Sequence, residues 1–215
     1  LCKQLNIYKL RSKVEILNLS NEFIVAALSI EKFLSLDSSS NLEGYTSKYN
    51  EDTIFIDPRL KKLGARLIVN LEKLNLSLKK LKLNKGNVED YYEFSHKLGI
   101  SQIDNINLQN KVFGIECNYE ELNGIDYKKG CYVGQENTAR IKHKNKLSKR
   151  LLAVKAIEGN IDSDEIFFKE KEIGKLLIKN KNPFALIKIQ NDQFNFENIY
   201  RCGNAKIKVQ KPEWF

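Results

Sequence analysis

The last third of the chain carries a series of short segments in which apolar and polar residues alternate. They read RLLAVKAI, DEIFFKE, KEIGKLLIKN, PFALIKIQ and NAKIKVQ, with turn residues such as Gly159-Asn160 and Asn182-Pro183 between them. Alternation indicates a strand with one buried face, and many short strands at close spacing are typical of a small barrel or sandwich. Of these two, we expect a C-terminal β-barrel domain over residues 149–215.

The preceding part of the chain mixes strand and helix patterns. Its polar stretch at 36–52 is expected to be a loop, and a turn is expected at Asp57-Pro58. Strands are expected at residues 13–19, 22–30, 53–56 and 65–69.

Helices are expected at two places in this first part. Asn87 is a suitable N-cap, acidic residues follow it, and Gly99 ends the pattern, so a helix is predicted between them. A short helix is predicted after Gly134, whereas the leucines of 71–86 suit either a helix or a strand. The expected fold class is therefore α+β, with a first domain at residues 1–148.

The charge balance is strongly basic. The chain has 36 Lys and Arg against 27 Asp and Glu, which gives a formal net charge of +9. Such a surplus attracts polyanions, including nucleic acid. The lysines are nevertheless spread along the whole chain and do not form a localised patch with interleaved aromatic residues. Direct nucleic-acid binding is an open alternative and is not favoured.

The sequence contains no membrane or export signal. No run approaches the ~18 apolar residues of a membrane span. Residues 1–20 lack the apolar core of a signal peptide. We therefore expect no membrane association and a cytoplasmic location. The absence of Met leads us to expect that this chain is part of a longer protein.

Four cysteines are present, and they lie far apart, at Cys2, Cys117, Cys131 and Cys202. None belongs to a CxxC pair, so neither a disulfide framework nor a closed zinc or iron–sulfur site is expected from this chain alone. His96 and His143 are the only histidines. We predict no metal site and reduced thiols.

The stretch KGCYVGQENTAR at residues 129–140 is the strongest candidate site. Gly130 and Gly134 permit left-handed dihedral angles or the close approach of a ligand to the backbone. Positive potential from Lys129 and the start of a helix would favour the thiolate form of Cys131. Alternatively, Cys131 is a small buried residue in a tight turn. The helix also offers an i, i+4 ion pair between Glu136 and Arg140.

The longer stretch LNGIDYKKGCYVGQENTAR resembles the signature of the YgfZ-type folate-binding proteins, which are relatives of the glycine-cleavage T protein (aminomethyltransferase) and include mitochondrial iron–sulfur assembly factors. The family pattern is K-G-C-[FY]-x-G-Q-E-x-x-[AS]-R. It is matched here by Lys129, Gly130, Cys131, Tyr132, Gly134, Gln135, Glu136, Ala139 and Arg140. Weaker similarity in YKLRSKVEI, FIDPRLKKLGAR, GIECNYEELNG and KRLLAV extends the resemblance over nearly the whole chain.

The resemblance implies a T-protein-like folate-binding domain that is incomplete at its N-terminus, followed by the barrel. It also implies a site. Cys131 would be the redox-active or cluster-facing thiol, and Glu116 would hold the pterin of tetrahydrofolate, since a carboxylate accepts two parallel hydrogen bonds. Glu116 could instead point outward or pair with a lysine. The other candidate folate-binding residues are Lys129, Tyr132, Gln135, Glu136 and Arg140.

The function that the resemblance implies is that of a folate-binding accessory protein. It would support assembly or repair of iron–sulfur clusters in client enzymes, including enzymes that modify tRNA. Its partners would be tetrahydrofolate and either iron–sulfur assembly proteins or the client enzymes. It would not be a classical enzyme. The alternatives are a tetrahydrofolate-dependent aminomethyl or one-carbon transferase, because kinship of fold does not establish a reaction, and an RNA-binding protein.

The sequence departs from the family pattern in several places. Gly114 and Ser101 stand where Pro is usual, and Lys144-Asn145 stand where the family has Arg-Gly. Lys lacks the planar fork with which Arg binds a carboxylate at two points. The basic run at 142–150 could attract a folate glutamate tail, although a solvated linker is the favoured interpretation. The family's central aspartate lies in a segment without a counterpart here.

Overall fold

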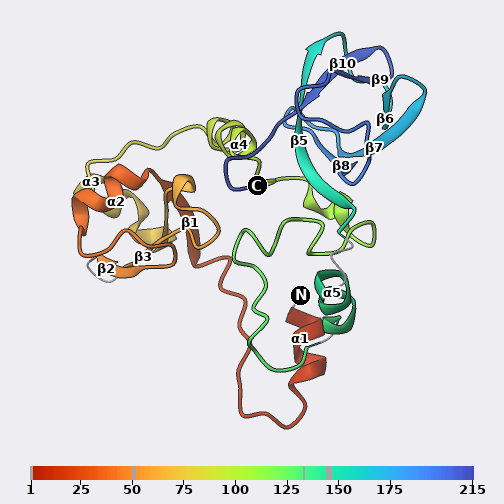
Figure 1. The fold of residues 1–215 in the computed structure, drawn as a ribbon. Coiled ribbons are helices and arrows are strands. Elements are labelled where there is room, and N and C mark those ends of the chain that lie inside the picture. The colour runs from red at the N-terminus through yellow and green to blue at the C-terminus, as the bar shows by residue number, and fades with distance from the viewer. Residues whose placement is uncertain (1, 50–51, 133, 144–146) are drawn as a thin grey trace. The chain divides into compact units, whose positions relative to one another are not determined.

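The computed structural model describes residues 2–49, 52–132, 134–143 and 147–215. The chain divides into two compact units. The first comprises Leu1–Asp57 and Gly64–Lys85, and the second comprises Pro58–Leu63 and Gly86–Phe215 (Figure 1). The motif residues at 113–143 and the barrel belong to the second unit.

The first unit is built on an antiparallel sheet of four strands in the order β1-β4-β3-β2. One face packs against Phe33 of α2 and against Leu81, and Ile54, Ile56 and Leu67 of the sheet complete this core. The elements are α1 (Cys2–Lys9), β1 (Phe23–Leu28), α2 (Ile30–Leu36), β2 (Thr46–Tyr49), β3 (Asp52–Ile56), the 3-10 helix η1 (Lys61–Leu63, of the second unit), β4 (Ala65–Asn70), the 3-10 helix η2 (Leu71–Lys73) and α3 (Leu74–Lys80).

The predicted strands at 22–30, 53–56 and 65–69 are confirmed by β1, β3 and β4, whereas two expectations for this unit are wrong. Residues 13–19 form no strand although all of them are described: Val14, Leu17 and Leu19 are 44–63% exposed, and no neighbouring strand accepts their backbone. Strand β2 lies within the predicted polar loop and forms a hairpin with β3. Alternation makes a strand only where a partner strand supplies hydrogen bonds.

The second unit contains a closed six-stranded barrel, which confirms the predicted C-terminal β-barrel. The strands follow the order β10-β5-β8-β7-β6-β9. Their bounds are β5 (Lys149–Glu158), β6 (Glu165–Phe168), β7 (Lys171–Ile178), β8 (Phe184–Lys188), β9 (Tyr200–Cys202) and β10 (Ala205–Val209). Strand β9 is absent from the prediction, because the alternation of its three residues is too short to stand out between polar loops.

The barrel interior is filled by small and branched side chains. Leu152, Val154, Ile166 and Ile187 are completely buried there. Cys202 is also buried and donates a hydrogen bond from Sγ to the Ser163 carbonyl at 3.1 Å. Burial raises the pKa of this thiol. Cys202 therefore behaves as a small core residue.

The remaining elements of the second unit are the helix α4 (Val88–Lys97), the 3-10 helix η3 (Asn105–Leu108) and the helix α5 (Gln135–His143). The side chain of Asn87 accepts a hydrogen bond from the Glu89 backbone N–H at 3.1 Å, and Gly99 adopts a φ of +75° after the last turn. Both observations confirm the predicted helix between these two residues. The indole N–H of Trp214 donates to the Leu98 carbonyl at 2.8 Å and ties this helix end to the C-terminal segment.

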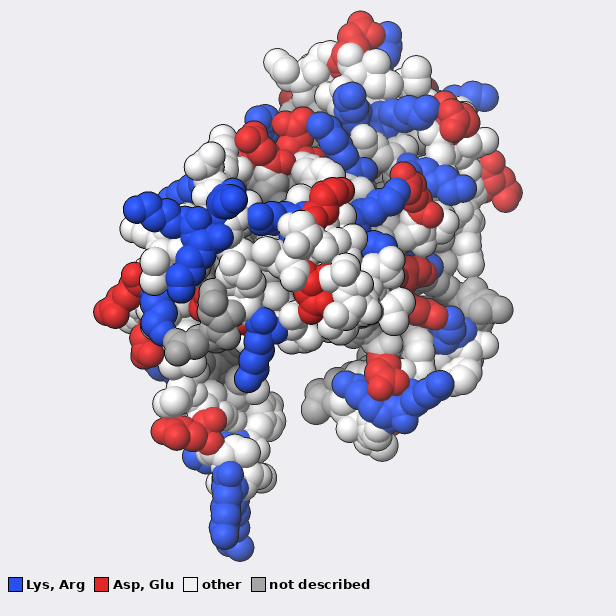
Figure 2. Space-filling model, turned by 90° about the vertical axis from the view of Figure 1, so that its left-hand side faces the viewer, with Lys and Arg blue, Asp and Glu red and all other residues white. Residues whose placement is uncertain are grey.

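Charged side chains of both signs are mixed over the surface. On the face drawn in Figure 2, Lys and Arg are interspersed with Asp and Glu. Four lysines of the barrel are held in ion pairs: Lys179 with Asp164, Lys188 with Glu172, Lys206 with Glu158 and Lys208 with Glu197. On this face the positive charge is therefore distributed among acidic side chains.

Candidate functional site

The segment 113–124 folds into a tight turn that is bonded to the first barrel strand. The Leu151 N–H donates to the Glu116 carbonyl at 2.8 Å, and the Asn118 side chain donates from Nδ2 to the Leu151 carbonyl at 2.7 Å. Asn118 is 2% exposed and has a φ of +62°, a conformation that Asn tolerates better than most residues. The turn that carries Glu116 is thereby fixed to β5.

Arg150 is the centre of this attachment. Its guanidinium donates to Asn118 Oδ1 at 3.0 Å, forms an ion pair with Glu121 at 2.5 Å and lies 5.5 Å from the centre of the Phe215 ring. Burial acts to raise the pKa of Glu121, but the hydrogen bond and the charge of Arg150 lower it overall. Among the described residues, Arg150 Nε and Glu121 Oε2 are buried without a hydrogen-bond partner. No local periodicity could have revealed this cluster, because its members lie far apart in the sequence.

Glu116 uses part of its carboxylate to hold its own turn. Its Oε2 atom accepts a hydrogen bond from the Phe113 backbone N–H at 2.9 Å, and the residue is partly buried. No lysine pairs with it among the described residues. A ligand with two parallel donors would therefore share Oε2 with the backbone or displace that bond.

The Tyr119 ring lies over two glycines of the same turn. A Cβ atom at Gly114 would come 3.0 Å from Tyr119 Cδ2, and one at Gly124 would come 3.1 Å from Tyr119 Cβ. Both contacts are tighter than ordinary van der Waals separation. The glycine found at 114, where the resembled family usually has Pro, is thus the residue that leaves room for this ring.

Cys117 follows Glu116 and is half-buried beneath the turn. Burial and the neighbouring Glu116 carboxylate raise the pKa of its thiol to about 11. At neutral pH the Cys117 thiol is therefore protonated, which makes it a weak nucleophile. No role was predicted for Cys117, because no sequence motif distinguishes it from the other thiols.

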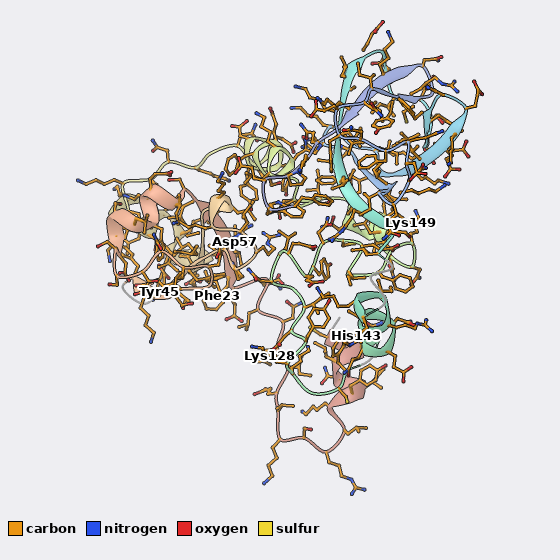
Figure 3. All side chains as sticks on the ribbon, in the orientation of Figure 1. Phe23, Tyr45, Asp57, Lys128, His143 and Lys149 are labelled. Atoms are coloured by element: carbon orange, nitrogen blue, oxygen red, sulfur yellow. The ribbon has the colours of Figure 1, made fainter. Side chains whose placement is uncertain are left out.

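The loop that carries Cys131 is open. Cys131 is exposed, so the alternative of a buried residue in a tight turn is excluded. A Cβ atom at Gly130 or Gly134 would meet nothing within 4 Å, but Gly134 adopts a φ of +89°, which favours glycine on conformational grounds alone. In Figure 3, Lys128 marks this loop and His143 the end of α5.

The predicted site residues around Cys131 contact one another locally. The Lys129 ammonium lies 4.5 Å from the centre of the Tyr132 ring, and the Tyr132 N–H donates to Gln135 Oε1 at 3.2 Å. Arg140 donates to Asn137 Oδ1 at 3.0 Å. The predicted Glu136–Arg140 pair is wrong, because the guanidinium turns to the amide three residues before it.

Glu120 connects the Cys131 loop to the Glu116 turn. The Tyr127 hydroxyl donates to Glu120 Oε2 at 3.1 Å, and Lys142 of α5 forms an ion pair with Glu120. Among the described residues, no hydrogen bond, ion pair or ring contact joins Glu116 directly to Cys131. The Glu116 turn and the Cys131 loop are thus connected through Glu120, and they do not form a single site by direct contact of Glu116 with Cys131.

The described side chains contain no group of three or more His, Cys, Asp and Glu arranged to hold a metal ion. A cluster bound at Cys131 would therefore need ligands from elsewhere.

The positions that depart from the family pattern have separate outcomes. Ser101 donates from its hydroxyl to the Asn105 side chain, whereas Lys144 and Asn145 lie outside the described residues. At the two ends of the basic run, Lys142 and Arg150 are both held in ion pairs.

The fold and the site together define a barrel-bearing protein with an exposed, glycine-flanked thiol. Comparison with curated proteins finds similarity to iron–sulfur cluster assembly factors named IBA57. The chain is 30% identical to the Dictyostelium discoideum IBA57 homolog, over 74% of this chain and 40% of that protein. It is 28% identical to the mouse protein, over 76% of this chain and 44% of that protein, and 30% identical to the human protein, over 47% and 28%. No model of a protein family matches the chain.

These comparisons support the resemblance to the iron–sulfur factors but test neither the kinship with the T protein nor folate binding. The chain spans less than half the length of these relatives. The expectation of a cytoplasmic protein is wrong, because all three relatives are named mitochondrial proteins. Reduced thiols and a polar surface suit both compartments, so composition gave no basis for choosing between them. No helix among the described residues is both long and apolar enough to cross a membrane.

Proposed function

We propose that this protein acts in mitochondrial iron–sulfur cluster assembly. The observation that carries the proposal is the similarity of three-quarters of the chain to proteins named as iron–sulfur cluster assembly factors. The exposed Cys131 on its open loop is the structural feature that suits this role. A thiolate is the usual protein ligand of such clusters.

In this proposal Cys131 is a shared ligand. An exposed single thiol flanked by glycines can approach a cluster held by another protein without steric hindrance from its own loop. The remaining ligands come from the partner, which is either a carrier of the assembly machinery or a client enzyme, including enzymes that modify tRNA. The cluster is cargo in transit.

Tetrahydrofolate is the second component of the proposal. The part of the chain before the barrel would then be an incomplete T-protein-like folate domain, with Glu116 accepting hydrogen bonds from the pterin. The attachment of the Glu116 turn to β5 supports this assignment, since a ligand-binding carboxylate needs a rigid base. Lys129, Tyr132, Gln135, Glu136 and Arg140 would line the approach to the thiol.

The cluster part is tested in cells depleted of the protein. Activity of a [4Fe–4S] enzyme should fall, while a mitochondrial enzyme without a cluster keeps its activity. Re-expression of the unmutated chain should restore the activity, and Cys131→Ser should not. Cys2→Ser is the matched control, because it removes a thiol that no proposed step uses. Full restoration by Cys131→Ser would remove the thiol from the mechanism, and unchanged cluster enzymes after depletion would overturn the assembly role.

The folate part is tested separately by calorimetric titration of the purified chain with tetrahydrofolate. Glu116→Ala should weaken binding at least about tenfold, since a charge-assisted hydrogen bond is worth about 1.5–3 kcal/mol. The affinity of Glu116→Gln should lie between those of the unmutated chain and Glu116→Ala. Glu136→Ala changes a residue on the exposed face of α5 and should bind tetrahydrofolate more tightly than Glu116→Ala. Absence of binding by the unmutated chain would exclude the folate part and leave the cluster experiment unaffected.

A further inference from the structure

A cavity of about 270 Å³ lies within the second unit, apart from the Cys131 loop. It is bounded by the turn after α4, by η3, by the Glu116 turn and by the start of the barrel. None of the residues assigned above to the thiol or to folate lines it. The volume is slightly below the range of about 300–1,000 Å³ typical of small-molecule sites, so a ligand of one ring is the size that fits.

Most of the wall is apolar and comes from elements that are distant in the sequence. Ile100, Leu122, Leu151 and Phe184 line the cavity and are themselves buried in the packed core, and Leu108 adds a fifth apolar side chain. Because these side chains belong to core clusters, the wall is preformed. An apolar wall with a few polar groups is the usual composition of a binding pocket.

Polar groups gather at one part of the wall. Arg59, Cys117 and Tyr119 all line the cavity. Because all three line one cavity of about 270 Å³, these groups lie close together. Burial raises the pKa of the Tyr119 hydroxyl, and the charge of Arg59 acts in the opposite direction. Arg59 is the one charged residue among the described residues that line the cavity, and its Nη1 atom also donates to Gln102 at 3.5 Å.

We propose that this cavity binds a small aromatic carboxylate, with the ring against the Phe184 and Leu151 wall and the carboxylate at Arg59 and Tyr119. Two aromatic side chains in the wall favour a planar ring, since edge-to-face contacts add to apolar burial. The guanidinium of Arg matches a carboxylate with two parallel hydrogen bonds, and the Tyr119 hydroxyl supplies a further donor. The acid end of the ligand lies beside the Cys117 thiol.

Cys117 makes the proposal directly measurable. A bound ligand covers this thiol, while Cys131 stays exposed on its own loop and serves as an internal reference. The 215-residue chain is incubated at pH 8.5 with iodoacetamide, with and without benzoate at millimolar concentration, and alkylation of each cysteine is followed by peptide mass spectrometry. Benzoate should slow alkylation of Cys117 at least about fivefold in a saturable manner, and alkylation of Cys131 should not change.

Two comparisons separate this site from nonspecific protection. Benzamide has the same ring without the charge and should bind at least about tenfold more weakly, because the charge-assisted pair with Arg59 is lost. In Arg59→Gln, the affinity for benzoate should fall to that for benzamide. Leu108→Phe should prevent binding of both probes, because the larger side chain fills the cavity. If Leu108→Phe fails to fold, calorimetric titration of benzoate into Arg59→Gln and into the unmutated chain still tests the proposal.

The outcomes are decisive in both directions. Absence of saturable protection and of calorimetric binding would overturn the proposal. Equal binding of benzoate and benzamide, unchanged in Arg59→Gln, would overturn the assignment of a carboxylate ligand. No folate and no iron–sulfur protein is present in the assay, so its result is independent of the proposed function.

Discussion

The two halves of the signature region differ in how they are held. The Glu116 turn is fixed to the barrel by two backbone-directed hydrogen bonds at Leu151 and by the Arg150 cluster. Among the described residues, the Cys131 loop has local contacts and is connected to the Glu116 turn through Glu120, and its glycines face open space. The turn is therefore a rigid base, whereas the loop is an accessible arm. This difference suits the proposed roles, in which Glu116 is a fixed carboxylate and Cys131 reaches a partner.

The ion pairs of the adjacent residues Glu120 and Glu121 provide the strongest test of this difference between the turn and the loop. Arg150→Met removes the partly buried partner of Glu121 and should lower the free energy of unfolding by about 3 kcal/mol, because an uncompensated carboxylate remains in the turn. Lys142→Met removes the more exposed partner of Glu120 and should cost less than about 1 kcal/mol. Urea unfolding of both variants gives the two values. Equal losses would contradict the distinction between base and arm.

Thiol reactivity distinguishes the same two regions chemically. At pH 7.5, iodoacetamide should alkylate exposed Cys131 at least about tenfold faster than Cys117, whose pKa is raised to about 11 by burial and by Glu116. The Cys117 rate should continue to rise with pH up to about 11, as its thiolate fraction grows. Peptide mass spectrometry over a pH series measures both rates. A Cys117 rate that levels off below pH 9 would contradict the raised pKa of this thiol.

The two glycines that flank Cys131 should respond differently to the same substitution. Gly134→Ala forces a side chain into a φ of +89° and should cost about 1 kcal/mol. Gly130→Ala has no such φ and no neighbour within 4 Å, so it should be neutral or slightly stabilising. Thermal unfolding and hydrogen exchange in α5 are measured for both variants. A larger loss of stability in Gly130→Ala than in Gly134→Ala would indicate that the backbone at position 130 requires glycine.

The smallest effect is expected at Lys129. Its ammonium lies 4.5 Å from the Tyr132 ring at an exposed position, and Lys129→Met should change the free energy of unfolding by no more than about 0.5–1 kcal/mol. Chemical denaturation of this variant provides the measurement. If Lys129→Met also loses cluster-enzyme activity in cells, the loss reports a functional contact, because the fold is retained. A large destabilisation would instead make Lys129 a structural residue.

Much of the fold followed from local patterns. The Asn87 cap, the Gly99 stop and the alternating segments after residue 149 each specify their element from neighbouring residues, and these elements form as expected. The strand expected at 13–19 fails because alternation specifies a face but not a partner. The three-residue β9 was missed because its strand character comes from pairing with β10 and β6.

The candidate site divides in the same way. The sequence by itself determined which residues form the signature, that Gly134 can take a left-handed conformation and that Cys131 stands apart from any metal-binding cysteine pair. Only the tertiary structure decided that Cys131 is exposed while Cys117 is half-buried, that Arg150 fastens the Glu116 turn to the barrel, and that Arg59, Tyr119 and Phe184 meet around one cavity. Exposure, desolvation and charge pairing depend on groups brought together from distant positions, and no local pattern carries that information.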